Sequence, residues 1–135
     1  MSSNTRLIHS IRTQTQGSLH FFEARKDIPF DIKRIYYVVD APAGAERGGH
    51  AHKKLQQFLF CPYGKVEIKL DDGEKTESIL LDRPDKGLIL TPCVWREMIW
   101  IKDASVLCVA VSDYYNENDY IRDYQDFIQH VKENR

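Results

Sequence analysis

The chain has 135 residues, with 19 lysines and arginines against 20 aspartates and glutamates and a net charge of -1. That length suits one domain and is too short for two ordinary ones. A hydrophobic content of 42% and an aromatic content of 11% exclude a disordered chain, and the near-zero charge gives no electrostatic reason to expect nucleic-acid binding.

The sequence also gives no sign of membrane insertion or secretion. No apolar run approaches the roughly 18 residues that a membrane-spanning helix needs, and the first residues lack the basic and then apolar build of a signal peptide. Three cysteines, Cys61, Cys93 and Cys108, lie far apart in apolar stretches, which favours buried reduced thiols over a metal or redox role. We therefore expect a cytoplasmic protein that binds neither membranes nor nucleic acid.

Short strands separated by turn residues fill most of the chain. Residues 65–70 alternate polar and apolar side chains, as a half-buried strand does, and Asp72-Gly73 supplies a hairpin turn before a return strand. β-branched and aromatic residues mark the other strands. In chain order the predicted strands cover residues 18–24, 33–40, 56–61, 65–70, 77–81, 88–92, 95–101 and 106–112.

Only the C-terminal segment has helical periodicity. Apolar and aromatic residues recur at helical spacing from Tyr120 to Val131, and Asn118 or Asn116 is a candidate N-cap. We interpret this stripe as a helix packed on a sheet rather than as a cofactor site. Many short antiparallel strands and one terminal helix predict a single all-β domain over residues 1–135, built as a small barrel or sandwich.

The pair His50 and His52 is the most informative feature of the sequence. Residues two apart on a strand project to the same face, so the two imidazoles point together, about 7 Å apart along the chain. The surrounding stretch resembles the first cupin motif, with five residues between Gly44 and His50, Gln57 in place of the usual glutamate, and Gly64 closing the motif. The resemblance implies a cupin jelly-roll barrel.

A metal site at this pair looks incomplete. A metal cupin adds a carboxylate and a third histidine, whereas Gln57 offers a neutral amide and Glu97 stands about where the third histidine is expected. Arg96 adds a cation beside these positions, which disfavours a divalent metal. We therefore expect no metal and no other cofactor, with imidazoles that act as acids or bases, because the ordinary histidine pKa of about 6.5 lies near the operating pH.

The strand predicted at residues 33–40 has two unlike faces. Arg34, Tyr36 and Val38 share one face, while the three residues between and after them form an apolar and aromatic face. The face that carries Arg34 and Tyr36 suits a polar cavity. A half-buried core position is the alternative for Tyr36.

Five segments in order resemble the nucleotide-sugar 3,4-ketoisomerases, cupins that act on dTDP-4-keto-6-deoxy-D-glucose. They are residues 34–37 (RIYY), 47–54 (RGGHAHKK), 71–73 (DDG), 94–98 (VWREM) and 112–115 (SDYY), and the likeness runs from about residue 17 to residue 127. The resemblance implies an isomerase that moves a carbonyl from C4 to C3 through an enediol or enediolate without a redox cofactor. Its product leads to the 3-amino-3,6-dideoxy sugars of bacterial surface glycans, including lipopolysaccharide.

The resemblance also implies roles for particular residues. His50 is the expected base, Tyr36 its partner in moving protons at the sugar, and His52 a hydrogen-bond donor to the enediolate or a support for His50. Guanidinium groups suit the diphosphate or sugar oxygens, with surface solvation as the alternative for each arginine. A tryptophan suits stacking on thymine, with core packing as the alternative. The candidate substrate-binding residues are Arg34, Arg47, Gln57, Trp95 and Arg96.

Two positions depart from the family pattern. Gln16 stands where many relatives carry arginine, and Arg96 stands where some carry histidine. By resemblance both border the sugar and affect which face of C4 receives the proton, and Arg96 favours the gluco-configured product. The sequence leaves that configuration open.

Two other functions remain as alternatives. A metal-dependent cupin enzyme would be distinguished by its metal content, and a noncatalytic sugar-nucleotide-binding cupin would not require His50.

The resemblance further implies a homodimer, and we expect a strand near residues 5–10 to be exchanged with, or added to, the partner's sheet.

Overall fold

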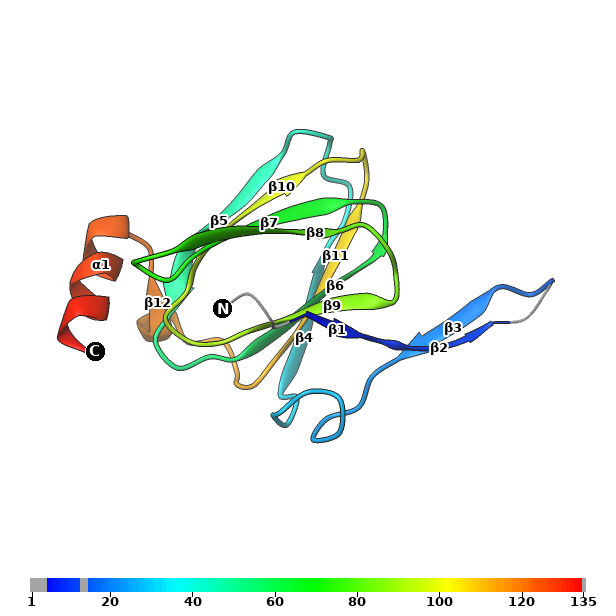
Figure 1. The fold of residues 1–135 in the computed structure, drawn as a ribbon, viewed down its shortest axis with the longest axis horizontal. Helices are drawn as coiled ribbons and strands as arrows, with labels where there is room; N and C mark the ends of the chain where they lie inside the picture. The colour runs from blue at the N-terminus through cyan, green and yellow to red at the C-terminus, as the bar shows by residue number, and fades with distance from the viewer. Residues whose placement is uncertain (1–4, 13–14, 135) are drawn as a thin grey trace.

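The computed structural model describes residues 5–12 and 15–134. Short strands joined by turns make up most of this part of the chain, and an α-helix follows them (Figure 1). The elements are, in chain order, β1 (Thr5–Leu7), β2 (His9–Arg12), β3 (Ser18–Phe21), β4 (Arg34–Val38), β5 (Glu46–His52), β6 (Gln57–Tyr63), β7 (Val66–Asp71), β8 (Thr76–Leu81), β9 (Lys86–Leu90), β10 (Trp95–Trp100), β11 (Val106–Val111), the 3-10 helix η1 (Glu117–Asp119), β12 (Tyr120–Ile121) and α1 (Tyr124–Glu133).

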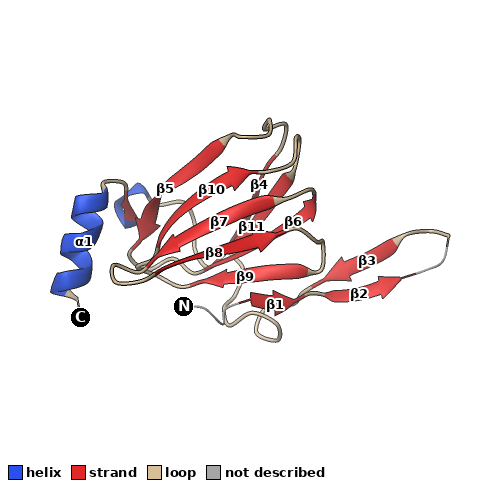
Figure 2. Cartoon of the chain, turned by 45° about the horizontal axis from the view of Figure 1, so that its top comes forward, coloured by secondary structure: helices blue, strands red, loops and turns tan. Residues whose placement is uncertain are grey.

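Two five-stranded antiparallel sheets form the body of the protein, as Figure 2 shows. One has the strand order β1-β9-β6-β11-β4 and the other the order β12-β5-β10-β7-β8. The all-β prediction with a short C-terminal helix is therefore confirmed. Each strand predicted from the sequence has a counterpart, with ends that differ by at most three residues, because turn residues locate a strand better than they define its last hydrogen bond.

The main hydrophobic core lies between the two sheets. Strand β7 illustrates it, since Val66, Ile68 and Leu70 are buried while the residues between them are less so. Trp100 is the largest fully buried side chain, and its indole N–H donates a hydrogen bond of 2.8 Å to the carbonyl oxygen of Ser105. The alternation that predicted these strands thus also identified the residues that fill the core.

A second, smaller core covers the outer face of the sheet that contains β6. Phe58 points to this face, while its neighbour Leu59 points into the main core. Ile8, Ile28 and Phe30, from the N-terminal region, pack over Phe58. This packing holds the N-terminal third of the chain against the body.

The N-terminal strands form two separate pairings within the single chain described. Strand β1 pairs with β9 of the same chain. Strands β2 and β3 pair only with each other among the described strands, and their hairpin projects from the body (Figure 1). At the end of one sheet, β4 has a strand partner on one side only.

The C-terminal region corrects the predicted start of the helix. Asn116 caps η1 rather than α1, and Tyr120 and Ile121 form the short strand β12 instead of a first helical turn. Helix α1 begins at Tyr124, after Asp123, whose carboxylate accepts a 3.0 Å hydrogen bond from the backbone N–H of Asp126. The pairing of β12 with β5 satisfies backbone groups that a longer helix would leave at a sheet edge.

The three cysteines differ in burial. Cys61 is buried, Cys93 and Cys108 are half-buried, and none of the three forms a disulfide in the chain as described. None of the helices in the described ranges has the length and apolar character needed to cross a membrane.

Gly87, on β9, is expected to tolerate no side chain. A Cβ atom there would lie 2.0 Å from the ring of Phe58, which is 1% exposed in the second core. We expect Gly87→Ala to lower the free energy of unfolding by about 1–3 kcal/mol through overpacking.

Urea denaturation of Gly87→Ala, Phe58→Leu and the double variant measures the effect. Because the smaller leucine makes room for the methyl group, the double variant should lose less stability than the sum of the two single variants. Additive losses would contradict a steric origin.

Candidate active site

A pocket of about 520 Å³ opens between the two sheets. Its walls come from β4 and β11 of one sheet, β5 and β10 of the other, and the segment around η1 and β12. Four of the residues predicted from the sequence line it: His50, Tyr36, Arg34 and Arg47. His52 lines a smaller pocket of about 110 Å³ that shares Arg34 and Tyr120 with the larger one.

Strand β5 places His50 and His52 on one face, as their spacing predicted. Their ring centroids lie 5.0 Å apart with the rings nearly perpendicular. Tyr120, directly opposite His52 in the β5–β12 register, packs against both rings at 5.1 and 4.3 Å. Just before the pair, Gly48 adopts a φ of +92°, and a Cβ atom there would lie 3.0 Å from the Arg96 carbonyl oxygen. A glycine is therefore required where β5 bends into the site.

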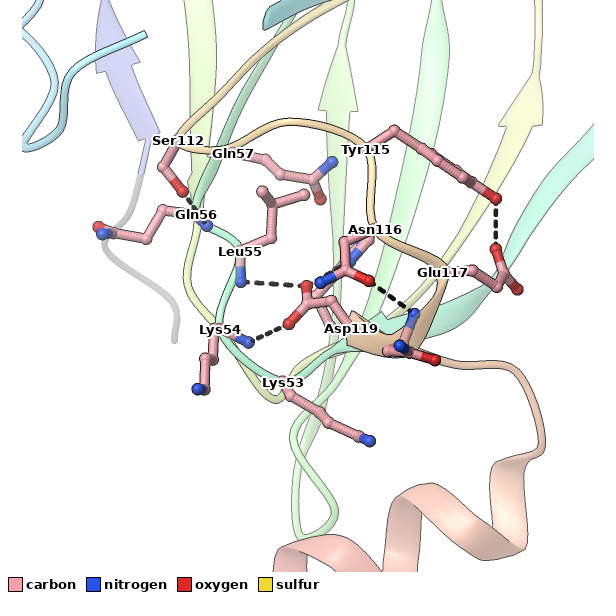
Figure 3. A network of polar contacts seen from close by, with 12 residues as sticks. Lys53, Lys54, Leu55, Gln56, Gln57, Ser112, Tyr115, Asn116, Glu117 and Asp119 are labelled. Carbon is pink, nitrogen blue, oxygen red and sulfur yellow. Dashed lines mark hydrogen bonds and ion pairs between the residues drawn. The ribbon is translucent and has the colours of Figure 1, made fainter. Parts of the chain in front are cut away.

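Asp119 holds the second histidine. Its Oδ2 lies 3.0 Å from Nδ1 of His52. The same carboxylate accepts hydrogen bonds from the backbone N–H groups of Lys54, at 2.8 Å, and Leu55, at 3.3 Å (Figure 3). Sequence analysis missed Asp119, because no local pattern connects two side chains that are 67 positions apart.

Tyr36, Gln57 and Arg96 form a buried chain of hydrogen bonds. Nε2 of Gln57 donates to the Tyr36 hydroxyl at 3.0 Å, and the Arg96 guanidinium donates to Oε1 of Gln57. The guanidinium also donates to the carbonyl oxygen of Val94 at 3.3 Å. These contacts fix the amide of Gln57, with its oxygen toward the cation and its nitrogen toward the phenol.

Arg96 and Trp95 do not occupy the positions expected of residues that contact substrate directly. Arg96 is 0% exposed and lies beneath Gln57 rather than in the wall of the pocket. Trp95, on the opposite face of β10, packs against Tyr124 at 5.3 Å and against Phe127 of α1. Neighbouring residues on a strand face opposite ways, so the geometry supports the core-packing alternative for Trp95.

Burial and charge together keep both histidines neutral. Desolvation, followed by the nearby positive charge of Arg96, lowers the pKa of His50 and of His52 from 6.5 to about 3. The contact between His52 and Asp119 is therefore a hydrogen bond from a neutral imidazole, not an ion pair. Desolvation also raises the pKa of Tyr36, which stays a protonated hydroxyl.

The rim of the pocket combines aromatic rings with cations, and Arg122 and Tyr120 were not among the site residues predicted from the sequence. The Arg122 guanidinium lies over the ring of Tyr120 at 4.1 Å and pairs with Glu117 at 2.6 Å. Arg34 lies 5.3 Å from the ring centre of Tyr36, and its buried Nε has no hydrogen-bond partner among the residues described. Such a rim offers guanidinium groups to an anion and ring faces to a planar base.

The described residues contain no group of three or more histidine, cysteine, aspartate and glutamate side chains arranged to hold a metal ion. Gln57 occupies the position of the cupin glutamate, with its amide already engaged by Tyr36 and Arg96. Glu97 is exposed on the other face of β10 from Arg96.

A family model described as "FdtA: WxcM-like, C-terminal" matches residues 2–132. The chain belongs to this FdtA family.

Relatives of this FdtA-family protein share both its sequence and its fold. A TDP-4-oxo-6-deoxy-α-D-glucose-3,4-oxoisomerase from Aneurinibacillus thermoaerophilus is 46% identical over 117 residues, which cover 87% of this chain and 84% of the relative. The crystal structure of a 3,4-ketoisomerase from Helicobacter canadensis is 43% identical, with a TM-score of 0.92 and 98% of each chain covered.

The sugar 3,4-ketoisomerase QdtA from Thermoanaerobacterium thermosaccharolyticum, solved in complex with TDP, is 40% identical with a TM-score of 0.92, and 99% of this chain and 98% of that chain are covered. A histidine-to-asparagine mutant of the same enzyme was solved with TDP-4-keto-6-deoxyglucose. These matches confirm the resemblance to sugar 3,4-ketoisomerases inferred from the sequence.

Acidification is expected to destabilise the protein partly through His50 and His52. Their pKa is about 3 in the folded protein and 6.5 in the unfolded chain, so between these values the unfolded chain binds protons that the folded protein does not. Stability is therefore full above about pH 6.5 and falls as the pH drops toward 3, by on the order of 1–2 kcal/mol for each histidine at pH 5.

Urea denaturation at pH 7 and pH 5 measures this loss. We expect His52→Gln, whose side chain does not titrate, to reduce the difference between the two pH values. A difference as large as that of the unsubstituted protein would contradict a neutral, buried His52.

Proposed function

We propose that this protein is a TDP-4-keto-6-deoxy-D-glucose 3,4-ketoisomerase. The observation that carries the proposal is the pair of neutral imidazoles, His50 and His52, beside the protonated Tyr36 at a pocket between the sheets. A ketoisomerase needs a base that is unprotonated at neutral pH and a hydrogen-bond donor beside the oxygen that gains negative charge. The relatives named above catalyse this class of reaction.

His50 is the base that removes the proton from C3 of the sugar. The electrons of the C3–H bond form a C3–C4 double bond, and the C4 carbonyl oxygen becomes an enediolate oxygen beside a hydrogen-bond donor, Tyr36. The C3 hydroxyl then loses its proton as the C3 carbonyl forms, the C4 oxygen gains a proton to become a hydroxyl, and C4 receives a proton. No atom is gained or lost, so the step requires no redox cofactor and we propose that it proceeds without a metal.

Arg96 supports the enediolate through its charge rather than by contact. Its guanidinium bonds only to neutral oxygens, those of Gln57 and Val94, so the positive charge is not cancelled by a hydrogen-bonded carboxylate. A buried charge acts strongly across a region from which water is excluded. The chain from Arg96 through Gln57 to Tyr36 therefore favours negative charge at the oxygen that Tyr36 contacts.

The pocket rim suits the nucleotide part of the substrate. Arg34, Arg47 and Arg122 line the pocket and supply guanidinium groups for the diphosphate, and Tyr115 and Tyr120 offer ring faces to thymine. The complex of QdtA with TDP supports this assignment.

We assign the product the gluco configuration at C4, which provides a 3-keto sugar for amino-sugar formation. We place the enzyme in the cytoplasm, where reduced thiols are the norm.

The functional unit is a homodimer. The hairpin of β2 and β3 exposes Ile11 and Leu19, which are 54% and 61% exposed, and the edge strand β4 exposes Ile35 and Tyr37, at 60% and 66%. Apolar side chains on a projecting hairpin and on a sheet edge favour pairing with a second copy of the chain. The proposed interface thus joins the hairpin of one protomer to the β4 edge of its partner.

Proton NMR in deuterated water tests the proposed reaction. With chelator-treated protein and TDP-4-keto-6-deoxy-D-glucose, we expect the C3 proton signal to disappear while a 3-keto sugar appears, and the couplings of the product show its configuration at C4. Replacing the base by His50→Asn should reduce turnover by roughly 100- to 10,000-fold. His130→Asn, on α1 and away from the proposed dimer interface, is the matched control and should turn over normally.

Three results would overturn parts of this proposal. Exchange that appears only after a divalent metal is added would show a metal-dependent cupin enzyme. Binding of the nucleotide sugar without exchange under either condition would indicate a binding protein. Normal turnover by His50→Asn would show that another group is the base.

Sedimentation velocity at micromolar concentration tests the dimer. The unsubstituted protein should sediment as a dimer, and Ile35→Glu should shift it toward monomer, because a carboxylate would then be buried at the interface. Leu80→Glu, at a 37% exposed position on β8, is the control and should leave the dimer intact. A monomeric unsubstituted protein would refute the proposal.

A further inference from the structure

The environment of His52 is more restrictive than that of His50. Its Nδ1 faces the carboxylate of Asp119 at 3.0 Å, and its side chain is 1% exposed. Its other ring nitrogen, Nε2, is buried and has no hydrogen-bond partner among the residues that the structure describes. A buried polar atom without a partner carries a free-energy cost unless a ligand supplies the missing hydrogen bond.

We propose that Asp119 is a positioning residue that holds His52 as the tautomer with hydrogen on Nδ1, so that Nε2 presents a lone pair to a hydroxyl group of the substrate. A carboxylate only accepts hydrogen bonds, so the ring nitrogen facing it carries the hydrogen. In a neutral ring the other nitrogen then carries none. His52 therefore accepts a hydrogen bond at Nε2, whereas the sequence had suggested that it donates one.

This assignment rests on the proposed ketoisomerase function and divides the work between the two histidines. The reaction requires removal of a proton from carbon at C3 and of a second proton from the C3 hydroxyl. With His50 at the C–H bond, the Nε2 lone pair of His52 receives the hydroxyl proton as the C3 carbonyl forms, and the resulting imidazolium is stabilised by Asp119. The same imidazolium returns its proton to the C4 oxygen, which restores the neutral ring.

The surroundings of Asp119 leave its carboxylate little freedom to turn away. Backbone N–H groups of Lys54 and Leu55 donate to its two oxygens, and its own carbonyl oxygen accepts from the N–H of Lys53 at 2.9 Å. Figure 3 shows the carboxylate between this loop and the η1 segment. The residue that orients His52 thus also ties down the loop that follows β5.

The substitution Asp119→Asn reverses the polarity of the atom that faces His52 and Leu55 and preserves the contact with Lys54. The amide oxygen still accepts from the N–H of Lys54, while the NH₂ group faces Nδ1 of His52 and moves the ring hydrogen to Nε2. We expect kcat to fall on the order of 100-fold with KM changed little, because the nucleotide contacts are untouched. Ring ¹⁵N NMR of His52 should show hydrogen on Nδ1 in the unsubstituted protein and on Nε2 in the variant.

Asp123→Asn is the matched control. It removes the same charge four positions away, and asparagine remains a good helix cap for the N–H of Asp126. We expect it to leave both kcat and the His52 tautomer unchanged.

The NMR measurement needs no turnover, so it tests the positioning role even if the proposed reaction is wrong or if Asp119→Asn folds poorly. Hydrogen on Nε2 of the unsubstituted protein, or a ring protonated at both nitrogens at pH 7, would overturn the proposal. Normal kcat in Asp119→Asn with a reversed tautomer would also overturn it, because the orientation of the ring would then not matter.

Discussion

The buried positive charge of Arg96 is the constraint on which the rest of the site depends. Its guanidinium is fully buried and has only neutral hydrogen-bond partners, Gln57 and Val94. Desolvation lowers its pKa to about 10, which still leaves it charged at neutral pH. Burying such a charge costs several kcal/mol, which the packing of the two sheets must offset. In return, the charge adds to the effect of burial in keeping both histidines neutral, and it orders the amide that supports Tyr36.

The position of Arg96 follows from the alternation of β10. Arg96, Met98 and Trp100 face the interior between the sheets, so Trp95 faces outward, where α1 covers it. The C-terminal helix therefore does more than cover Trp95. By burying the outer face of β10 it holds the strand that carries the guanidinium, which links a peripheral element to the electrostatics of the pocket.

Sequence patterns predicted the parts of the site that depend on neighbouring residues. A two-residue period placed His50 and His52 on one face, and the same period placed Tyr36 inward on β4. The period does not distinguish the two faces of β10, so it gave no means to choose between Trp95 and Arg96 as the inward residue. The predicted helix start was wrong because the sequence analysis considered only Asn116 and Asn118 as caps, whereas the pairing of β12 with β5 delays the helix until after Asp123.

Asp119 lies beyond such patterns for a different physical reason. Its contact with His52 exists because β12 pairs with β5, the strand that carries both histidines. This pairing joins distant parts of the sequence, so no local spacing encodes it. The pocket is thus built from two preorganised arrays. Arg96–Gln57–Tyr36 reaches from β10 across to β4 of the other sheet, and Asp119–His52 is held along β5. A sugar bound between them meets a hydroxyl donor on one side and imidazole lone pairs on the other. That asymmetry is what a proton transfer between two adjacent carbons requires, since one oxygen must gain a proton while its neighbour loses one.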